Sequence, residues 1–245
     1  MRIDIITLFP EFFASPLHTG LVGKALEGDI ASVHLTNPRQ FATDKHRRVD
    51  DECYGGGVGM LLKPDPLFAA VESLPRLDPR QIILMTPQGS PITQSVLKEL
   101  ACLPQLVLIC GHYEGVDERV RHHLVTHELS LGDFVLTSGE IPALAVLNGV
   151  VRLLPGTVGK VESLKQESFE AGLLDFPQYT RPPEFRGHTV PDVLLSGNHQ
   201  AIATWRRHQQ LIRTWQRRPD LLDPTLLSEA DQSFLREWQN NGQNC

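Results

Sequence analysis

The sequence predicts an α/β fold, with a mostly parallel sheet covered by helices and a small all-helical C-terminal part. Short runs rich in Val, Ile and Leu alternate with helical segments over residues 1–135. These runs are continuously apolar, which is typical of parallel strands buried on both faces. Residues 155–198 are instead rich in glycine and proline, and helical periodicity returns after them, which indicates a second part.

Five apolar runs are the expected strands. The first opens the chain, and each later run follows a segment with helical periodicity. A helix between successive strands is the usual connection in a parallel sheet. The expected strands are Ile3–Leu8, Ala31–Thr36, Gln81–Met85, Leu106–Cys110 and Leu129–Val135, and the expected helices lie near 16–27, 64–74, 92–102, 116–126 and 139–152.

Composition indicates a soluble globular chain. The 245 residues are 41% hydrophobic and 21% charged, which suits one large domain or one domain plus a small appendage. No apolar run approaches the roughly 20 residues of a membrane helix, so we expect no membrane association. The N-terminal MRIDIITLFPEFF carries one Arg and already contains an acid, so we interpret it as a first strand and not a signal peptide.

The four cysteines show no CxxC pair and no zinc spacing. Cys102 and Cys110 lie in apolar contexts, so we expect both to be reduced core residues. A cytoplasmic location follows from this expectation. The two other cysteines are Cys53 and Cys245.

The net charge of −6 argues weakly against a nucleic-acid partner, but the charge is unevenly spread. Residues 181–218 contain seven arginines and two acids, a local balance of +5. A local basic face governs phosphate binding even in an acidic chain. The sequence therefore permits RNA binding by the C-terminal part.

Helical periodicity returns at about 199–217 and again at 228–239. In the first of these helices the apolar residues and the arginines fall on opposite faces. The arginine face is either simply solvated or contacts phosphate, and the absence of acids between 193 and 219 favours phosphate. The apolar face is Ile202, Trp205, Ile212 and Trp215, and the basic face is Arg206, Arg213 and Arg217.

Glycine and carboxylate occur together in two loops that follow expected strands. The fourth strand leads into Gly111–Gly115, which contains Glu114, and the fifth leads through Leu131–Glu140. Thr86–Gly89 follows the third strand and is either a simple turn or a further wall of the same site. Open α/β sheets bind ligands at the carboxyl ends of their strands, so the loops are expected to close on one small molecule. Glu114, Asp117 and Glu118 also suit a solvated helix N-terminus, and Glu114 is the strongest functional candidate of the three.

The glycine cluster Tyr54–Met60 matches neither dinucleotide nor P-loop spacing, and the residues before it form no expected strand. It is either a flexible surface loop or a mobile flap beside His46, Arg47 and Arg48. The ten histidines form no HxH or HExxH pattern, and no GxSxG is present. We therefore expect no metal site and no serine hydrolase.

Six ordered strings carry a family resemblance: YGGGVGM at 54–60, GHYEGVDERV at 111–120, LGDFVLTSGEIP at 131–142, RLLPG at 152–156, GLLDFPQYTR at 172–181 and PDVLLSGN at 191–198. The chain resembles the bacterial tRNA (guanine-37-N1)-methyltransferases, the TrmD type of the SPOUT class. The resemblance covers nearly the whole chain.

The resemblance implies a SPOUT methyltransferase domain over residues 1–158 with a deep trefoil knot at roughly 84–142. It implies a flexible linker at 159–176 and a helical tRNA-binding domain at 177–245. It also implies S-adenosylmethionine as cofactor, use of magnesium, a homodimer, and contact with the tRNA anticodon arm. True knots are rare, and no pattern in the sequence predicts one.

The resemblance also implies the site residues. Many relatives have Gly-Gly where this chain has Ser138-Gly139. The implied cofactor pocket consists of Thr86, Pro87, Gln88, Gly111, Tyr113, Glu114, Leu131, Gly132, Asp133, Phe134, Val135, Leu136, Ser138 and Gly139.

Methylation of N1 of guanine 37 needs a base to remove the N1 proton and a cation to stabilise charge on O6. The resemblance implies Glu167 as the base, where the family usually has Asp, and Arg152 as the cation. Glu162 and Glu170 remain alternatives for the base. The replacement of Asp by Glu is the one feature that favours a second hypothesis, a non-catalytic RNA-binding protein of the same fold.

Overall fold

The computed structural model describes residues 1–159, 167–170 and 172–242, and the chain divides into two compact units, Met1–Gly159 and Lys160–Cys245. Each unit is described by itself. Part of the expected linker at 159–176 lies outside the described residues, as do Glu162 and Cys245.

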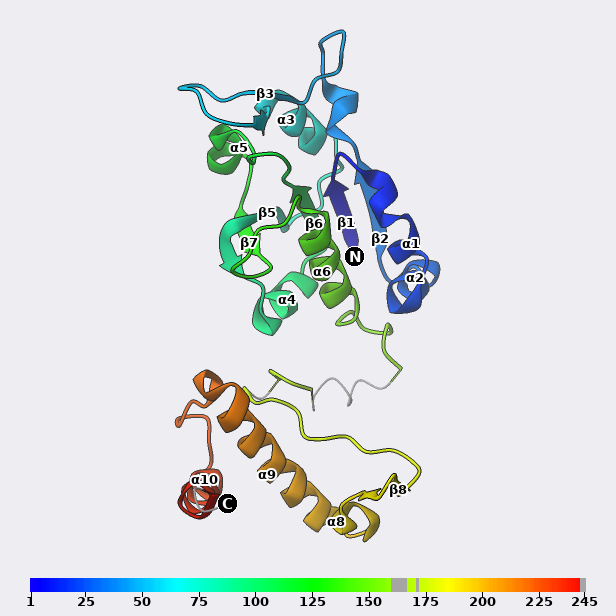
Figure 1. Cartoon of the computed structure of the whole chain (residues 1–245). Coiled ribbons are helices and arrows are strands. Elements are labelled where there is room, and N and C mark those ends of the chain that lie inside the picture. Colours follow the sequence, from blue (N-terminus) through cyan, green and yellow to red (C-terminus); the bar gives the residue numbers. More distant parts are fainter. Residues whose placement is uncertain (160–166, 171, 243–245) are drawn as a thin grey trace. The chain divides into compact units, whose positions relative to one another are not determined.

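The first unit is built on a five-stranded, wholly parallel sheet, which confirms the predicted α/β class (Figure 1). The strand order is β2-β1-β6-β5-β7. The central strand β6 is buried at every position, which explains its uninterrupted apolar sequence. The bounds are β1 Arg2–Ile6, β2 Ser32–Thr36, β5 Arg80–Pro91, β6 Gln105–Cys110 and β7 His127–Ser130.

Helices cover both faces of the sheet. One core cluster joins α2, α4 and α6 to side chains such as Ile3 and Leu108, and the other joins α3 and α5 to Val107 and Ile109. Alternate residues of β6 thus enter opposite cores, as the two-residue repeat of a strand requires. The helices are α1 Ala14–Leu17, α2 Gly20–Glu27, α3 Pro64–Glu72, α4 Gln94–Ala101, α5 Glu118–His123 and α6 Glu140–Val151, with short 3-10 helices η1 Pro10–Phe13 and η2 Pro38–Phe41.

The predicted end of the fifth strand is wrong. Strand β7 stops at Ser130 and does not continue to Val135. The Ser130 hydroxyl donates to the Gly132 carbonyl (3.1 Å), and the Phe134 amide donates to the same carbonyl (2.9 Å), so the chain turns there. The apolar residues beyond the turn belong to a loop.

The expectation of no strand before the glycine cluster is also wrong. Strand β3, Asp50–Glu52, pairs antiparallel with β4, Met60–Leu62, on either side of the cluster. Strands of three residues are too short to show periodicity in a sequence.

The expectation that Cys102 is a core residue is wrong, since Cys102 is exposed, whereas Cys110 is buried.

The second unit is mainly but not wholly helical, because a short antiparallel hairpin, with two residues in each strand, precedes its helices. Leu211 on α9 packs with Leu173 and Leu235 in a small core. Leu211 and Thr214 are the buried residues of α9. Trp215, which the sequence places on the apolar face of this helix, is exposed. The elements are β8 Glu184–Phe185, β9 His188–Thr189, α8 Asp192–Leu195, α9 His199–Arg217, η3 Pro219–Leu221 and α10 Glu229–Gly242.

A partly buried ion pair joins α9 to α10 in this unit. Arg207 Nε and Nη2 donate to the two oxygens of Asp231 (3.0 and 2.9 Å), and the Ser228 hydroxyl also donates to Asp231 (2.8 Å). Asp231 is 8% exposed. These hydrogen bonds lower the pKa of Asp231 to about 2, with the Arg207 bond as the largest cause.

Among the described residues, no helix is long and apolar enough to span a bilayer.

We predict that Asp231→Asn destabilises the second unit by about 2 kcal/mol at pH 7. Because the folded-state pKa lies below the ordinary value, the ionised carboxylate stabilises the fold above about pH 4, and this contribution disappears as the pH falls toward about 2. All three tryptophans (Trp205, Trp215 and Trp238) lie in this unit, so urea unfolding followed by tryptophan fluorescence reports on it. Equal unfolding of wild type and variant at pH 7 would contradict the prediction.

Candidate small-molecule binding site

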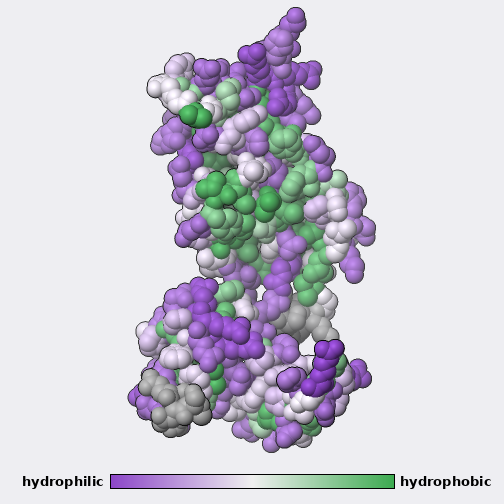
Figure 2. Space-filling model, in the orientation of Figure 1, coloured by the Kyte–Doolittle hydropathy of each residue, from purple (hydrophilic) through white to green (hydrophobic). Residues whose placement is uncertain are grey.

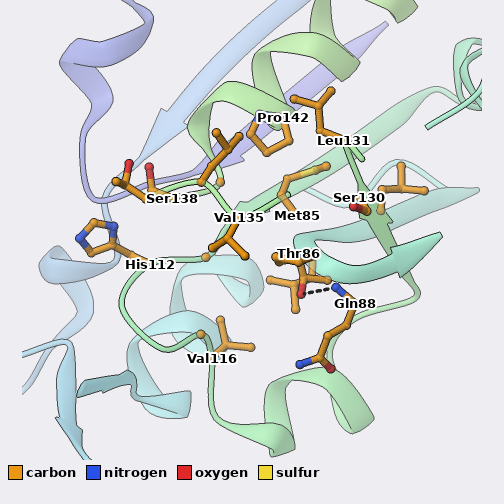
Figure 3. A pocket seen from close by; sticks show the side chains of 18 of the residues that line it. Met85, Thr86, Gln88, His112, Val116, Ser130, Leu131, Val135, Ser138 and Pro142 are labelled. Atoms are coloured by element: carbon orange, nitrogen blue, oxygen red, sulfur yellow. Dashed lines mark hydrogen bonds between the residues drawn. The ribbon is translucent and has the colours of Figure 1, made fainter. Parts of the chain in front are cut away.

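A cavity of about 240 Å³ opens where β5, β6 and β7 end or break, at the carboxyl edge of the sheet. Figure 3 shows Thr86, Val135 and Pro142, from three different segments, around one space. Three loops form its walls: Thr86–Gly89, Gly111–Gly115 and Leu131–Gly139. This is the edge at which the sequence predicts a ligand.

The first wall is a bulge within β5. Met85 and Ser90 both pair with Leu129 of β7, so the four residues between them leave the ladder. Gly89 returns the chain against the β7 backbone, where a Cβ would lie 2.5 Å from Leu129 N. Within the bulge, the Thr86 hydroxyl accepts a hydrogen bond from the Gln88 amide (3.3 Å, Figure 3).

The second wall follows β6 and is braced by β4. The Glu114 amide donates to the Met60 carbonyl (3.0 Å), and the Leu62 amide donates to the Gly115 carbonyl (3.0 Å). Tyr113 adopts a left-handed backbone conformation (φ 59°), which costs about 1 kcal/mol for a residue with a side chain. Strained residues of this kind cluster at ligand sites.

The base of the glycine cluster belongs to this wall. A Cβ on Gly59 would lie 2.5 Å from Glu114 Oε1, so the backbone of the cluster passes directly over that carboxylate. The tip differs, since Tyr54 and Val58 are fully exposed. The two interpretations of the cluster, surface loop and flap, therefore apply to the tip alone.

The third wall contacts the second through backbone atoms. The Gly139 amide donates to the Gly111 carbonyl (2.8 Å), and His112 and Ser138 form an isolated antiparallel bridge. A Cβ on Gly139 would lie 2.6 Å from Cys110 Cα, so only glycine fits. The rest of this wall is apolar and open, with Phe134 and Val135 exposed.

All the residues expected to hold a cofactor line the cavity except Gly132 and Asp133. The Gly132 carbonyl accepts a hydrogen bond from the Phe134 amide, and Asp133 lies in the turn that this bond closes. The sequence reasoning missed lining residues that belong to strands, helices or neighbouring loop positions. These are Leu84, Met85, His112, Gly115, Val116, Arg121, Leu129, Ser130, Thr137 and Pro142.

The charges around the cavity are mostly neutralised or paired. Burial, with Glu140 nearby, raises the pKa of the Cys110 thiol, so the thiol is neutral. Glu140 is itself buried and accepts a hydrogen bond from the Thr7 hydroxyl (2.6 Å), which ties α6 to the end of β1. Arg121 forms ion pairs with Glu118 and Glu128. Glu114 is the one carboxylate side chain among the described lining residues.

The two catalytic candidates lie in different units. Arg152 directly follows α6 in the first unit, and its amide donates to the Asn148 carbonyl (3.2 Å). Glu167 lies in the second unit at a turn whose Phe169 amide donates to the Leu173 carbonyl (2.8 Å). Ser168 Oγ accepts from the Asp175 amide (2.9 Å) and closes the same turn. Both side chains are half-buried.

Comparison with known proteins shows similarity over nearly the whole chain. Residues 1–224 match the family model described as tRNA (Guanine-1)-methyltransferase TrmD. A protein of Synechococcus sp. (strain JA-3-3Ab) is 72% identical over 237 residues, or 97% of this chain and 94% of the relative. One of Acaryochloris marina is 72% identical over 222 residues, or 90% and 94% of the two chains. Both relatives are named tRNA (guanine-N(1)-)-methyltransferase.

We predict that Gly139→Ala destabilises the first unit by about 3 kcal/mol, because the added methyl would overlap backbone atoms that cannot move aside independently. Thermal unfolding followed by circular dichroism measures the change. Gly159→Ala is the matched control, since a Cβ there meets nothing within 4 Å. If the two variants unfolded at the same temperature, the close contact at Gly139 would be without energetic consequence.

Proposed function

The chain belongs to the tRNA (guanine-1)-methyltransferase family, and we propose that it transfers a methyl group from S-adenosylmethionine to N1 of guanine 37, next to the anticodon. The observation that carries this proposal is the family match over residues 1–224, which includes every wall of the cavity. The relatives carry an enzyme's name, so the comparisons give no support to the alternative of a non-catalytic RNA-binding protein.

The cavity at the sheet edge is the proposed cofactor site. Its apolar lining suits an adenine ring, and its loop backbones offer amides and carbonyls to the polar atoms of a nucleoside. The carboxylate of Glu114 suits a positively charged group of the cofactor, its sulfonium or its α-ammonium. The bound cofactor supplies an electrophilic methyl group on a sulfonium sulfur.

The trefoil knot implied by the family is also part of the proposal. The supporting observation is the close passage of Gly139 against Cys110 and Gly111, which brings the segment before α6 onto the end of β6. In this proposal the knotted segment at roughly 84–142 contains all three walls of the site.

We assign the proton transfer to Glu167. Its carboxylate takes the N1 proton of guanine while N1 forms a bond to the methyl carbon, and the electron pair of the broken carbon–sulfur bond stays with sulfur. The guanidinium of Arg152 stabilises the negative charge that develops on guanine O6. The described residues contain no group of three His, Cys, Asp or Glu side chains suited to a metal, so no step is assigned to magnesium.

We propose a homodimer that buries an apolar face of the first unit. Figure 2 shows an apolar area over α6 and the loop before it. Large exposed apolar areas on a folded domain commonly mark interfaces. The exposed apolar side chains of this unit include Phe9, Phe12, Leu21, Phe134, Val135 and Ile141.

We propose that the second unit contacts the tRNA anticodon arm in the cytoplasm, where tRNA is used. Arg217 is exposed and Arg213 is half-buried on α9, and neither forms an ion pair with another described residue. Arg206 is a weaker candidate, because its guanidinium packs over the Phe176 ring, 4.7 Å from the centroid.

The direct test uses purified protein, S-adenosylmethionine with a labelled methyl group, and tRNA transcripts with guanine or adenine at position 37. We expect label on the guanine transcript, at N1 when the product nucleosides are separated. Tight tRNA binding without methyl transfer would overturn the proposed function and favour the non-catalytic alternative.

We predict that Glu167→Gln lowers kcat by at least about 100-fold, because the amide cannot accept the N1 proton. Cofactor affinity should change little, and single-turnover methylation with saturating tRNA measures the loss. Glu170→Gln, in the same turn, is the control and should stay near wild type. If Glu170→Gln lost activity and Glu167→Gln did not, the general base would be Glu170.

We also predict that Arg217→Gln weakens tRNA binding and reduces the slope of log affinity against log salt by about 1, the loss of one phosphate contact. Filter binding at several salt concentrations measures the slope. Arg218→Gln is the control, because Asp220 already pairs with Arg218 (2.7 Å). An unchanged slope in Arg217→Gln would contradict a phosphate contact at this position.

A further inference from the structure

Arg121 on α5 lies behind the first wall of the cavity and contacts that wall through Thr86. Its side chain is 12% exposed, and Arg121 is the only cationic residue among the described residues that line the cavity. Arg121 Nη2 donates to Thr86 Oγ1 (3.3 Å). A guanidinium this buried is held in one orientation by its partners, since few arginines are buried without them.

Two carboxylates hold the Arg121 guanidinium. Nη1 donates to Glu128 Oε2 on β7, and Nε lies 3.4 Å from Glu118 Oε2 on α5 itself. Arg121 thus connects a helix, the neighbouring strand and the β5 bulge. The planar guanidinium can serve three acceptors in fixed directions, which a lysine ammonium on a flexible stem does less well.

The bulge needs such support because Thr86–Gly89 makes no ladder bonds. Both Met85 and Ser90 pair with Leu129, so the four residues between them lie outside the ladder and depend on contacts such as that of Thr86 with Arg121. Gly89 packs on the backbone of Glu128, and the Glu128 side chain holds Arg121. Glu128 therefore contacts the bulge at two points. Its backbone packs against Gly89 at the end of the bulge, and its side chain holds Arg121, which contacts Thr86 at the start.

The ion pairs of Arg121 also affect how well the cavity can accept a positively charged ligand. A sulfonium cofactor is repelled by an unpaired guanidinium in a site of low dielectric constant. Glu118 and Glu128 offset the charge of Arg121. Arg121 can therefore support the wall of the site with little electrostatic cost to a cationic ligand.

We propose that Arg121 is a positioning residue for the methyl donor, holding the Thr86–Gln88 wall in its binding shape through the Thr86 hydroxyl. The inference rests on the proposed function, because it takes S-adenosylmethionine to be the ligand of this cavity. It assigns no chemical step to Arg121.

The test measures S-adenosylmethionine affinity by calorimetry and steady-state kinetics on tRNA for five single variants and one double variant. Arg121→Met removes the guanidinium, and Thr86→Val removes only the acceptor hydroxyl while keeping the shape of the side chain. Arg121→Lys and Thr86→Ser are the conservative variants. Arg119→Met is the matched control, because Arg119 is on the same helix, pairs with Asp117 (2.8 Å) and does not line the cavity.

We expect Arg121→Met to weaken cofactor binding and raise the KM for cofactor about tenfold, the loss of a hydrogen bond from a charged donor. At saturating cofactor, kcat should stay within about twofold, because only positioning for binding is lost. Thr86→Ser should rescue binding relative to Thr86→Val, Arg121→Lys should fall between Arg121→Met and wild type, and Arg119→Met should equal wild type. The double variant Arg121→Met/Thr86→Val should bind about as weakly as Thr86→Val alone, because loss of the Thr86 hydroxyl already breaks the Arg121 contact along with the Gln88 hydrogen bond.

Two results would overturn the inference, and they differ from failure of the proposed function. Wild-type affinity in both Arg121→Met and Thr86→Val would overturn it, and so would strictly additive effects in the double variant. If the wild-type protein itself bound no S-adenosylmethionine, the proposed function would fail first and the inference with it. If Arg121→Met failed to fold, Thr86→Val against Thr86→Ser would still decide whether the hydroxyl contact matters.

Discussion

The backbone contact between Gly139 and the end of β6 is the constraint on which the first unit depends. The Gly139 amide bonds to the Gly111 carbonyl at 2.8 Å, and no side chain fits between Gly139 and Cys110. Helix α6 starts directly after this contact and fills one core of the sheet with Val146, Leu147 and Val150. The same short contact thus determines where the ligand cavity ends and where the largest helix of the unit begins.

The remaining walls of the cavity are supported from outside. Strand β4 supports the Gly111–Gly115 loop through backbone hydrogen bonds, and α5 supports the β5 bulge through Arg121. Only the apolar side of the third wall, around Val135, lacks such support within the chain described. A cavity with two hydrogen-bonded walls and one open apolar wall fits a site that is completed by another surface, which agrees with the proposed homodimer.

The sequence predicts those features that repeat along the chain. The parallel sheet follows from five apolar runs, and helix α9 has the predicted bounds because its periodicity is strong and Asn198 caps it, accepting from the Ala201 amide (3.1 Å). The end of β7 is not predictable in this way, since Leu131–Val135 is apolar enough for a strand and a turn at Gly132 overrides it. The role of Arg121 is hidden for another reason. Its partners Thr86 and Glu128 come from separate segments, and only the fold brings them together.

The distribution of charge explains why this cavity suits a cation better than an anion. Glycine loops at a sheet edge usually suggest phosphate, because their amides and a helix N-terminus attract negative charge. Here the first turn of α6 carries the buried Glu140, and the one arginine of the cavity wall is held by two carboxylates. Glu114 adds a negative charge at the Gly111–Gly115 wall, and the Cys110 thiol is neutral. The cavity therefore offers a ligand with a positive centre one carboxylate and no unpaired cation among the described residues, as a sulfonium donor requires.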